Sequence, residues 1–169
     1  MGTTFQSFHA RHDDPMKVWA AIEEAAGCPV LLSRAVEDGW CSFYPKAVRK
    51  PRKLAAEVSQ TLGGLVLLFD VYDSDSCEIG LYNAGKLVTR FVNEYEDRQG
   101  EPGDAKRFAK YARNQDEADI RSDLDGETVF AEEIAAGLAG YYGLSRERVV
   151  RGFAWVRSPD EVGLVLARG

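Results

Sequence analysis

The stretch from residue 65 to residue 92 constrains the fold more than any other part of the chain. It reads LVLLFDVY, then a short acidic turn, then CEIGLY, the tight turn NAGK, and LVTRFV. In CEIGLY the apolar residues Cys77, Ile79 and Leu81 alternate with smaller or more polar ones. A period of two is typical of a β-strand with one buried face, and short turns join antiparallel neighbours. The stretch therefore predicts three consecutive antiparallel strands.

The N-terminal half predicts two helices around a second hairpin. Asp14 can cap a helix that begins at Pro15 and ends at Gly27. The segments PVLLSRAV and WCSFYP flank the turn-forming EDG, which predicts a hairpin that ends at Pro45. From about residue 51 to residue 62 apolar residues recur at helical spacing, and two glycines follow. The polar residues before Asp14 are predicted to form an N-terminal arm.

The C-terminal half predicts mainly helices. Asp104 can cap a short helix, a longer helix is predicted from about Thr128 to Tyr142, and Ser145 can begin another short one. GFAWV is strand-like, and the end is left open between a helix beginning at Ser158 and Pro159 and a last strand VGLVLA. The order of these elements predicts an α+β fold, an antiparallel β-sheet of about five strands with helices packed on one face.

The composition fits a single globular domain over residues 1–169. A chain of 18.7 kDa with 45% hydrophobic residues can bury a core without disulfides or a structural metal. Cys28, Cys41 and Cys77 are widely spaced and odd in number, so they are predicted to be small buried hydrophobes. Neither a signal-peptide pattern nor a run of about 18 apolar residues occurs, so we expect a cytoplasmic protein without a membrane partner.

Four carboxylates lie within nine positions, at Asp70, Asp73, Asp75 and Glu78. Carboxylates that converge on one point can hold a divalent metal or act as acid and base, so a metal-dependent hydrolase is one hypothesis. The favoured interpretation is structural, because Asp and Ser side chains in turns bond local backbone groups. Only Asp70 lacks such an explanation, since it shares a strand face with aliphatic residues. No cofactor and no catalytic motif are predicted.

Two further patterns contain the residue types of a metal site. His9 and His12, the two histidines of the chain, are three residues apart and precede two aspartates, but a polar arm is the favoured interpretation. Residues 121 to 132, RSDLDGETVFAE, nearly match a calcium-binding EF-hand loop. Arg121 occupies the first ligand position, where a cation opposes Ca²⁺, so an acidic loop leading into a helix is predicted instead. The sequence contains no glycine motif for nucleotide phosphates.

Residues 46 to 53, KAVRKPRK, carry five cations at the beginning of the second predicted helix. Cations at this end of a helix oppose its dipole and cost about 0.3–1 kcal/mol each at low salt. Either the protein's own carboxylates or a partner should compensate them. Nucleic acid is not expected as the main partner, because the chain has a net charge of −6 and residues 94 to 133 hold thirteen acids against six bases.

One resemblance adds to these patterns. The segment LLFDVYDSDSCEIGLYNAGKLVTRF resembles the central hairpin of small uncharacterised bacterial α+β proteins, in which an acidic DSD turn precedes a short strand, a tight glycine turn and a charged strand. The resemblance covers roughly residues 30 to 95. It implies a stand-alone domain and transfers no activity and no site residue.

The sequence favours a non-enzymatic protein-binding module, such as an immunity or inhibitor protein against a basic effector. Aromatic residues surrounded by acids suit an electrostatically steered, tight complex. The predicted interface comprises Tyr95, Glu96, Asp97, Phe108, Tyr111, Asp116 and Asp119. The partner is expected to be a basic protein, and a homodimer is left open.

Overall fold

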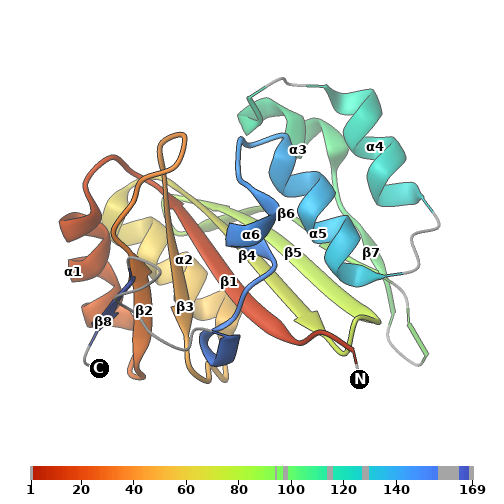
Figure 1. The fold of residues 1–169 in the computed structure, drawn as a ribbon. Helices are drawn as coiled ribbons and strands as arrows, with labels where there is room; N and C mark the ends of the chain where they lie inside the picture. The colour runs from red at the N-terminus through yellow and green to blue at the C-terminus, as the bar shows by residue number, and fades with distance from the viewer. Residues whose placement is uncertain are drawn as a thin grey trace.

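One antiparallel sheet organises the protein, with the strand order β7-β6-β5-β4-β1-β3-β2-β8 (Figure 1). The computed structural model describes residues 2–93, 95–96, 99–113, 116–126, 130–155 and 164–167. Within these residues the strands are β1 (Phe5–Arg11), β2 (Val30–Ser33), β3 (Trp40–Pro45), β4 (Leu65–Tyr72), β5 (Ser76–Asn83), β6 (Lys86–Val92), β7 (Glu101–Pro102) and β8 (Leu164–Ala167). The α+β class is confirmed, and the sheet has eight strands instead of about five.

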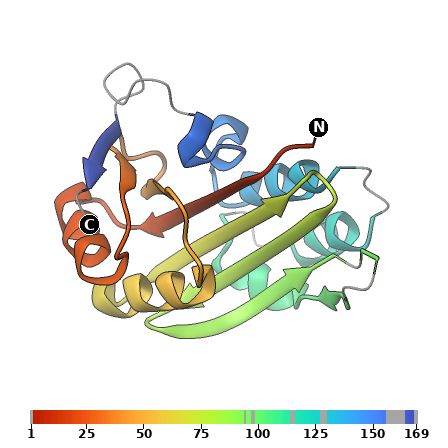
Figure 2. The same ribbon diagram turned by 90° about the horizontal axis from the view of Figure 1, so that it is seen from below.

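The helices cover both faces of the sheet rather than the one face that the sequence predicted. They are α1 (Pro15–Ala25), α2 (Pro51–Leu62), α3 (Ala105–Tyr111), α4 (Glu117–Asp125), α5 (Ala131–Gly140) and α6 (Arg146–Val149), with a 3₁₀ turn η1 (Phe153–Trp155). On β4, Leu67 and Phe69 pack in the core shared with α3 to α5, whereas Val66 and Leu68 pack in the core shared with α1 and α2. Figures 1 and 2 show the two helical layers on opposite sides of the sheet.

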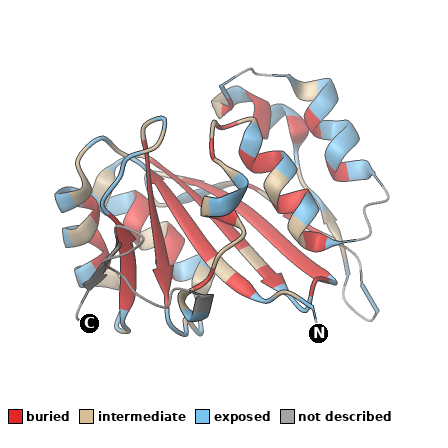
Figure 3. Cartoon of the chain, in the orientation of Figure 1, coloured by how far each residue is buried: buried red, intermediate tan, exposed pale blue. Residues whose placement is uncertain are grey.

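The segment predicted to be an N-terminal arm is a central strand, β1. It lies between β3 and β4, with Phe8 opposite Phe43 on one side and opposite Leu68 on the other. Phe8 is fully buried on the face covered by α1 and α2, and Ser7 and His9 are fully buried on the opposite face. In Figure 3 most of β1 has the colour of buried residues. The strand escaped the sequence analysis because its buried polar residues interrupt the apolar pattern on which strand prediction relies.

Most of the other local predictions are confirmed. α1 begins at Pro15, and the Asp14 side chain accepts a hydrogen bond from the N–H of Met16. α2 spans residues 51–62, and the predicted strands on either side of both hairpins pair antiparallel. α3 begins after Asp104, whose carboxylate accepts from the N–H of Arg107. α5 and α6 also lie where helices were predicted.

Two predictions in the C-terminal half are wrong. Residues 121 to 125, expected to lie in an acidic loop, belong to α4 (Glu117–Asp125), because Ile120 and Leu124 give this helix a buried side. GFAWV does not form a strand, since its residues 153–155 adopt the 3₁₀ turn. For the C-terminal segment, which the sequence left open between a helix and a strand, the structure shows a strand, because β8 pairs with β2. Thr128, Ser158 and Pro159, where helices were expected to begin, lie outside the described residues.

Two predictions from composition can also be compared with the structure. All three cysteines are free, and Cys41 and Cys77 are buried as predicted, whereas Cys28 is half-buried. Across the part of the chain that the structure describes, no helix combines the length and the apolar character that a membrane crossing requires.

A core substitution tests whether β1 is a central strand. The Phe8 ring stacks on Phe43 with centroids 5.0 Å apart and is fully buried. Phe8→Ala should lower the free energy of unfolding by about 3–5 kcal/mol, measured by urea denaturation. Met16→Ala, at an exposed apolar position of α1, should change it by less than about 0.5 kcal/mol. Equal small effects of the two substitutions would show that residues 5–11 are a dispensable arm.

Candidate functional site

The acidic turn between β4 and β5 is a tight hairpin turn on two residues in the left-handed region. Asp73 and Ser74 have φ values of 51° and 61°, as the type I′ turn requires of both central residues. Asp73 and Asp75 are exposed, whereas Ser74 is buried at 6% exposure. The predicted turn is therefore present, and it presents its two carboxylates to solvent.

Ser74 fastens this turn to two distant segments of the chain. Its Oγ accepts a hydrogen bond from the N–H of Thr3 at 2.7 Å, and its own N–H donates to the Thr3 carbonyl at 2.8 Å. Its carbonyl accepts from the N–H of Ala131 at 2.8 Å, and its Oγ donates to Glu132 at 3.0 Å. The N-terminal segment and the beginning of α5 are thus fixed against the turn.

Asn93 brings a fourth segment to the same place. Its Nδ2 donates to the Asp75 carbonyl at 2.6 Å, and its Oδ1 accepts from the N–H of Cys77 at 2.6 Å. Tyr95 follows two residues later, and the carboxylates of Asp75 and Glu96 raise the pKa of its phenol. The end of β6 and the residues after it therefore lie beside the turn.

Three large exposed aromatic residues belong to the segments that meet at this junction. Tyr72 is 69% exposed, Phe130 52% and Tyr95 39%, and Phe130 directly precedes the Ala131 amide that bonds Ser74. We call these aromatics and the adjacent exposed acids the turn patch. It comprises Tyr72, Asp73, Asp75, Tyr95, Glu96 and Phe130.

The structure places the interface residues predicted from sequence in different environments. Tyr95, Glu96, Asp116 and Asp119 are exposed, and Asp97 lies outside the described residues. Phe108 is fully buried in the core, so it cannot contact a partner and is removed from the interface. Tyr111 is half-buried, with the Lys110 ammonium 5.4 Å from its ring centroid. Sequence reasoning missed Tyr72 and Phe130, because only the fold shows that they are exposed.

The acids of α4 form a separate row on its exposed side. Asp116 caps the helix by accepting from the N–H of Asp119, and its carboxylate raises the pKa of the Asp119 side chain. Asp123 accepts a hydrogen bond from the Tyr141 hydroxyl at 2.6 Å. This row shows like-charge crowding on a helix surface rather than a ligand pocket.

Glu78 and the basic stretch at the beginning of α2 compensate each other. The Arg52 guanidinium donates two hydrogen bonds to the Glu78 carboxylate, at 2.7 and 2.9 Å, while the Glu78 side chain is only 6% exposed. Lys53 also pairs with Glu57 one helical turn later, at 3.5 Å. Part of the compensation that the sequence required therefore comes from the protein's own carboxylates.

Asp70 lies opposite Glu78 in the β4–β5 register, as the sequence suggested, and opposite Gln6 on β1. It is half-buried, and its Oδ2 is 3.4 Å from the Gln6 amide nitrogen. It lines a pocket of about 270 Å³ together with Lys46 and Tyr72. Asp70 is thus part of a polar row across the sheet rather than an isolated carboxylate.

The four acids of the hydrolase hypothesis do not converge. Asp73 accepts from the N–H of Gly2, Asp75 interacts with Tyr95, and Glu78 is held by Arg52. Within the described residues no group of three or more His, Cys, Asp or Glu side chains could hold a metal ion. No observation in this part of the chain therefore favours a metal-dependent hydrolase.

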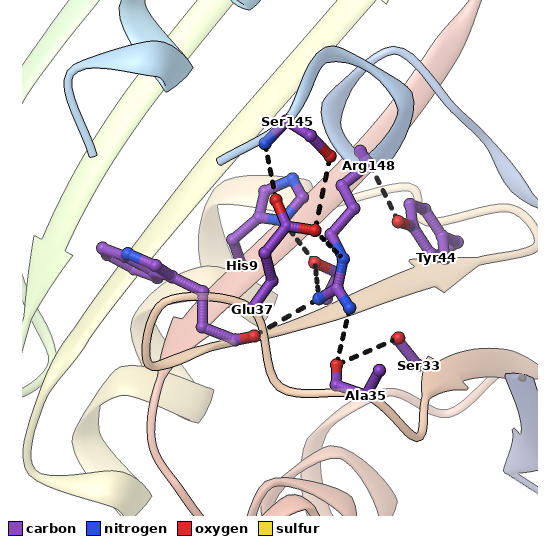
Figure 4. Close-up of polar contacts among 9 residues, drawn as sticks. His9, Ser33, Ala35, Glu37, Tyr44, Ser145 and Arg148 are labelled. Carbon is purple, nitrogen blue, oxygen red and sulfur yellow. Dashed lines mark hydrogen bonds and ion pairs between the residues drawn. The ribbon is translucent and has the colours of Figure 1, made fainter. Parts of the chain in front are cut away.

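His9 belongs to a buried polar network that the sequence did not predict (Figure 4). Its Nδ1 lies 2.8 Å from the Ser42 Oγ and its Nε2 3.2 Å from the Ser7 Oγ, which donates to the Val149 carbonyl. Burial, with a smaller contribution from Arg148, lowers the pKa of His9 to about 3. The imidazole is therefore neutral at physiological pH.

Arg148 extends this network to the β2–β3 hairpin (Figure 4). It pairs with Glu37 at 2.8 Å and donates to the Ala35 carbonyl at 2.7 Å. Glu37 also accepts from the N–H of Ser145 at 2.8 Å, and the Tyr44 hydroxyl donates to the Arg148 carbonyl at 2.8 Å. The network holds α6 against the sheet. Its serine and histidine side chains are buried, so we interpret its role as structural.

The other two metal-site patterns have local explanations. The Nδ1 of His12 accepts from the N–H of Asp14 at 2.9 Å, while His9 lies in the buried network described above. The EF-hand-like segment is helical from Arg121 to Asp125, so its acids do not line a loop. Neither pattern brings ligands together.

Comparison of the chain with protein-family models, with curated proteins and with solved structures finds no match. The resemblance to bacterial α+β proteins thus stays a prediction.

The Arg52–Glu78 pair can be tested as a structural interaction. Arg52→Gln should lower the free energy of unfolding by about 1–3 kcal/mol, because it leaves a buried carboxylate without its cation. The double substitution with Glu78→Gln should recover part of this loss, measured by urea denaturation as a double-mutant cycle. Strictly additive effects would show that the pair is not coupled.

The buried His9 predicts a specific acid sensitivity. Its pKa in the folded protein, about 3, is below its ordinary value of 6.5, so the unfolded chain binds the extra proton first. The free energy of unfolding should therefore fall as the pH decreases from about 6.5 to about 3, by up to about 1.4 kcal/mol per unit from this group. His9→Gln should flatten this dependence in urea titrations at several pH values. An unchanged slope would show that His9 is not the group responsible.

Proposed function

We propose that this chain is a non-enzymatic protein-binding module that binds a basic protein through the turn patch, in the manner of an immunity or inhibitor protein against a basic effector. One observation carries the proposal. Three exposed aromatic residues and three exposed carboxylates belong to the chain segments that hydrogen bonds join at one junction. In this proposal the protein acts in the cytoplasm.

The aromatic side chains supply the apolar part of such an interface. Aromatic residues carry much of the binding energy of protein complexes, and their rings attract the guanidinium groups of a partner. Packing in the hydrophobic core does not explain the three aromatic residues Tyr72, Phe130 and Tyr95, since each is exposed. Their placement at one junction supports a role in recognition.

The hydrogen bonds that hold the turn patch in place reduce the entropy cost of binding. Ser74 bonds both the N-terminal segment and the beginning of α5, and Asn93 bonds the backbone of Asp75 and Cys77 where the turn leads into β5. A surface that is already ordered loses less conformational freedom when a partner binds. This argument supports a tight complex with little rearrangement of the turn.

The charge of the patch favours a basic partner. Asp73, Asp75 and Glu96 are exposed in a chain with a net charge of −6. The acidic row on α4 adds to the same field without an aromatic anchor. Opposite charges accelerate association, and the acceleration decreases with salt. A homodimer through this patch would place like charges together, so a basic heterologous partner is preferred.

Capture by patch variants tests the proposal. The purified protein is immobilised and incubated with native lysate at about 50 and about 300 mM salt, and bound proteins are identified by mass spectrometry. A stoichiometric basic protein should bind, more weakly at the higher salt. Tyr72→Ser with Asp75→Asn should reduce its affinity by roughly a hundredfold, because an aromatic anchor and a charge are both lost.

A matched control makes the outcome specific. Met16→Ser with Asp13→Asn removes one exposed apolar side chain and one exposed acid from elsewhere on the surface. This variant should bind as well as the unchanged protein. Equal loss in both variants, an acidic partner, or no stoichiometric partner at either salt concentration would each count against the proposed function.

A further inference from the structure

A basic groove lies between the end of α1 and the beginning of α2. It has a volume of about 400 Å³, within the range of small-ligand sites. Ala25, Ala26 and Leu54 contribute apolar side chains to its wall, and Arg49, Lys50 and Lys53 contribute the cations. The groove shares no residue with the turn patch, so an inference about it goes beyond the function proposed above.

Internal ion pairs do not account for all of these cations. Arg52 is held by Glu78, and Lys53 pairs with Glu57 on the rim of the groove. Arg49 and Lys50 are exposed and make no ion pair or side-chain hydrogen bond to any other residue that the structure describes. Two cations of the groove therefore have no counter-charge among the residues that the structure describes.

Their position makes this lack costly. Lys50 precedes the first residue of α2 and provides no side-chain cap, although Asp, Ser or Asn is usual there. A cation at this end of a helix is repelled by the helix dipole. The neighbouring cations also repel one another. An anion bound in the groove would remove both penalties at once.

We propose that this groove binds a compact phosphate group, either of a soluble phosphorylated ligand or of a lipid headgroup. The Arg49 guanidinium suits bidentate bonds to phosphate oxygens, and Lys50 and Lys53 supply point charges. The concave shape and the small wall residues suit a compact anion. An extended nucleic acid would in addition meet the acidic remainder of the surface.

Pyrophosphate is the probe for the soluble form. It is titrated at constant ionic strength without divalent metal and followed by calorimetry and by the backbone amide resonances of residues 47–57. Saturable binding below about 10 mM is expected, with shifts concentrated in these residues. Cys28 lines the groove and is half-buried, whereas Cys41 and Cys77 are buried. Alkylation of Cys28 by neutral iodoacetamide should therefore slow when the groove is occupied.

Variants separate the groove from diffuse charge attraction. Arg49→Gln with Lys50→Gln should weaken pyrophosphate binding at least tenfold and abolish the protection of Cys28. It should also raise the melting temperature of the free protein slightly, since two unfavourable cations are gone. Lys86→Gln, beside the opposite end of α2, where Gly85 bonds the Ser59 hydroxyl, should change the affinity less than twofold.

Vesicles distinguish the two sources of phosphate. Co-sedimentation with vesicles of phosphatidylcholine and phosphatidic acid, in competition with pyrophosphate, would assign the group to a lipid headgroup. Pyrophosphate binding without co-sedimentation would assign it to a soluble ligand. The proposal is overturned if pyrophosphate shows no saturable binding, if Lys86→Gln weakens binding as much as the groove variant, or if vesicles bind without competition from pyrophosphate.

Discussion

The fold depends on a sheet whose central strands are buried on both faces, so every polar side chain on those strands must find a partner inside the protein. β1 and β4 are buried along most of their length, with exposed residues only at the last positions, Arg11 and Tyr72, and Ser7, His9 and Ser42 lie fully buried in this setting. An unsatisfied buried polar group costs about 1–3 kcal/mol. α6 satisfies them, because Arg148 and the Val149 carbonyl reach down to the sheet. The clamp of α6 thus follows from the polar residues of β1.

The need to pair buried polar groups also connects two features that looked independent in the sequence. The acidic stretch after β4 and the basic stretch before α2 meet in the Arg52–Glu78 pair. Residues that suggested chemistry, such as Glu78 and His9, therefore stabilise the fold. The aromatics and acids of the turn patch and the cations of the groove stay on the surface, and both proposals concern these residues.

Local sequence signals predicted the parts of the fold that local interactions determine. The capping residues Asp14 and Asp104, the tight turns and the period-two strands are interactions between near neighbours, and the structure contains them. β1 and α4 could not be found in this way. β1 is defined by burial between two other strands, and α4 by the packing of Ile120 and Leu124 against distant residues. Such long-range contacts leave little periodic trace in one sequence.

The predicted site also depends on long-range contacts that the sequence does not reveal. Asp116 and Asp119 are exposed, but sequence composition could not distinguish the buried Phe108 from the exposed Phe130. Exposure is decided by which face of a helix packs on the sheet. Tyr72 was likewise assigned only to the end of a strand, although its exposure directly before the acidic turn supports the recognition role proposed for the turn.

Hydrogen–deuterium exchange on the complex with the captured partner tests the proposed binding surface most directly. The proposal predicts slower amide exchange on binding in three peptides that meet at the β4–β5 turn, covering residues 72–76, 93–96 and 130–132, with α4 unchanged. Protection confined to α4, or to the groove between α1 and α2, would contradict it, because the partner would then be held by charge alone and without the aromatic residues of the turn.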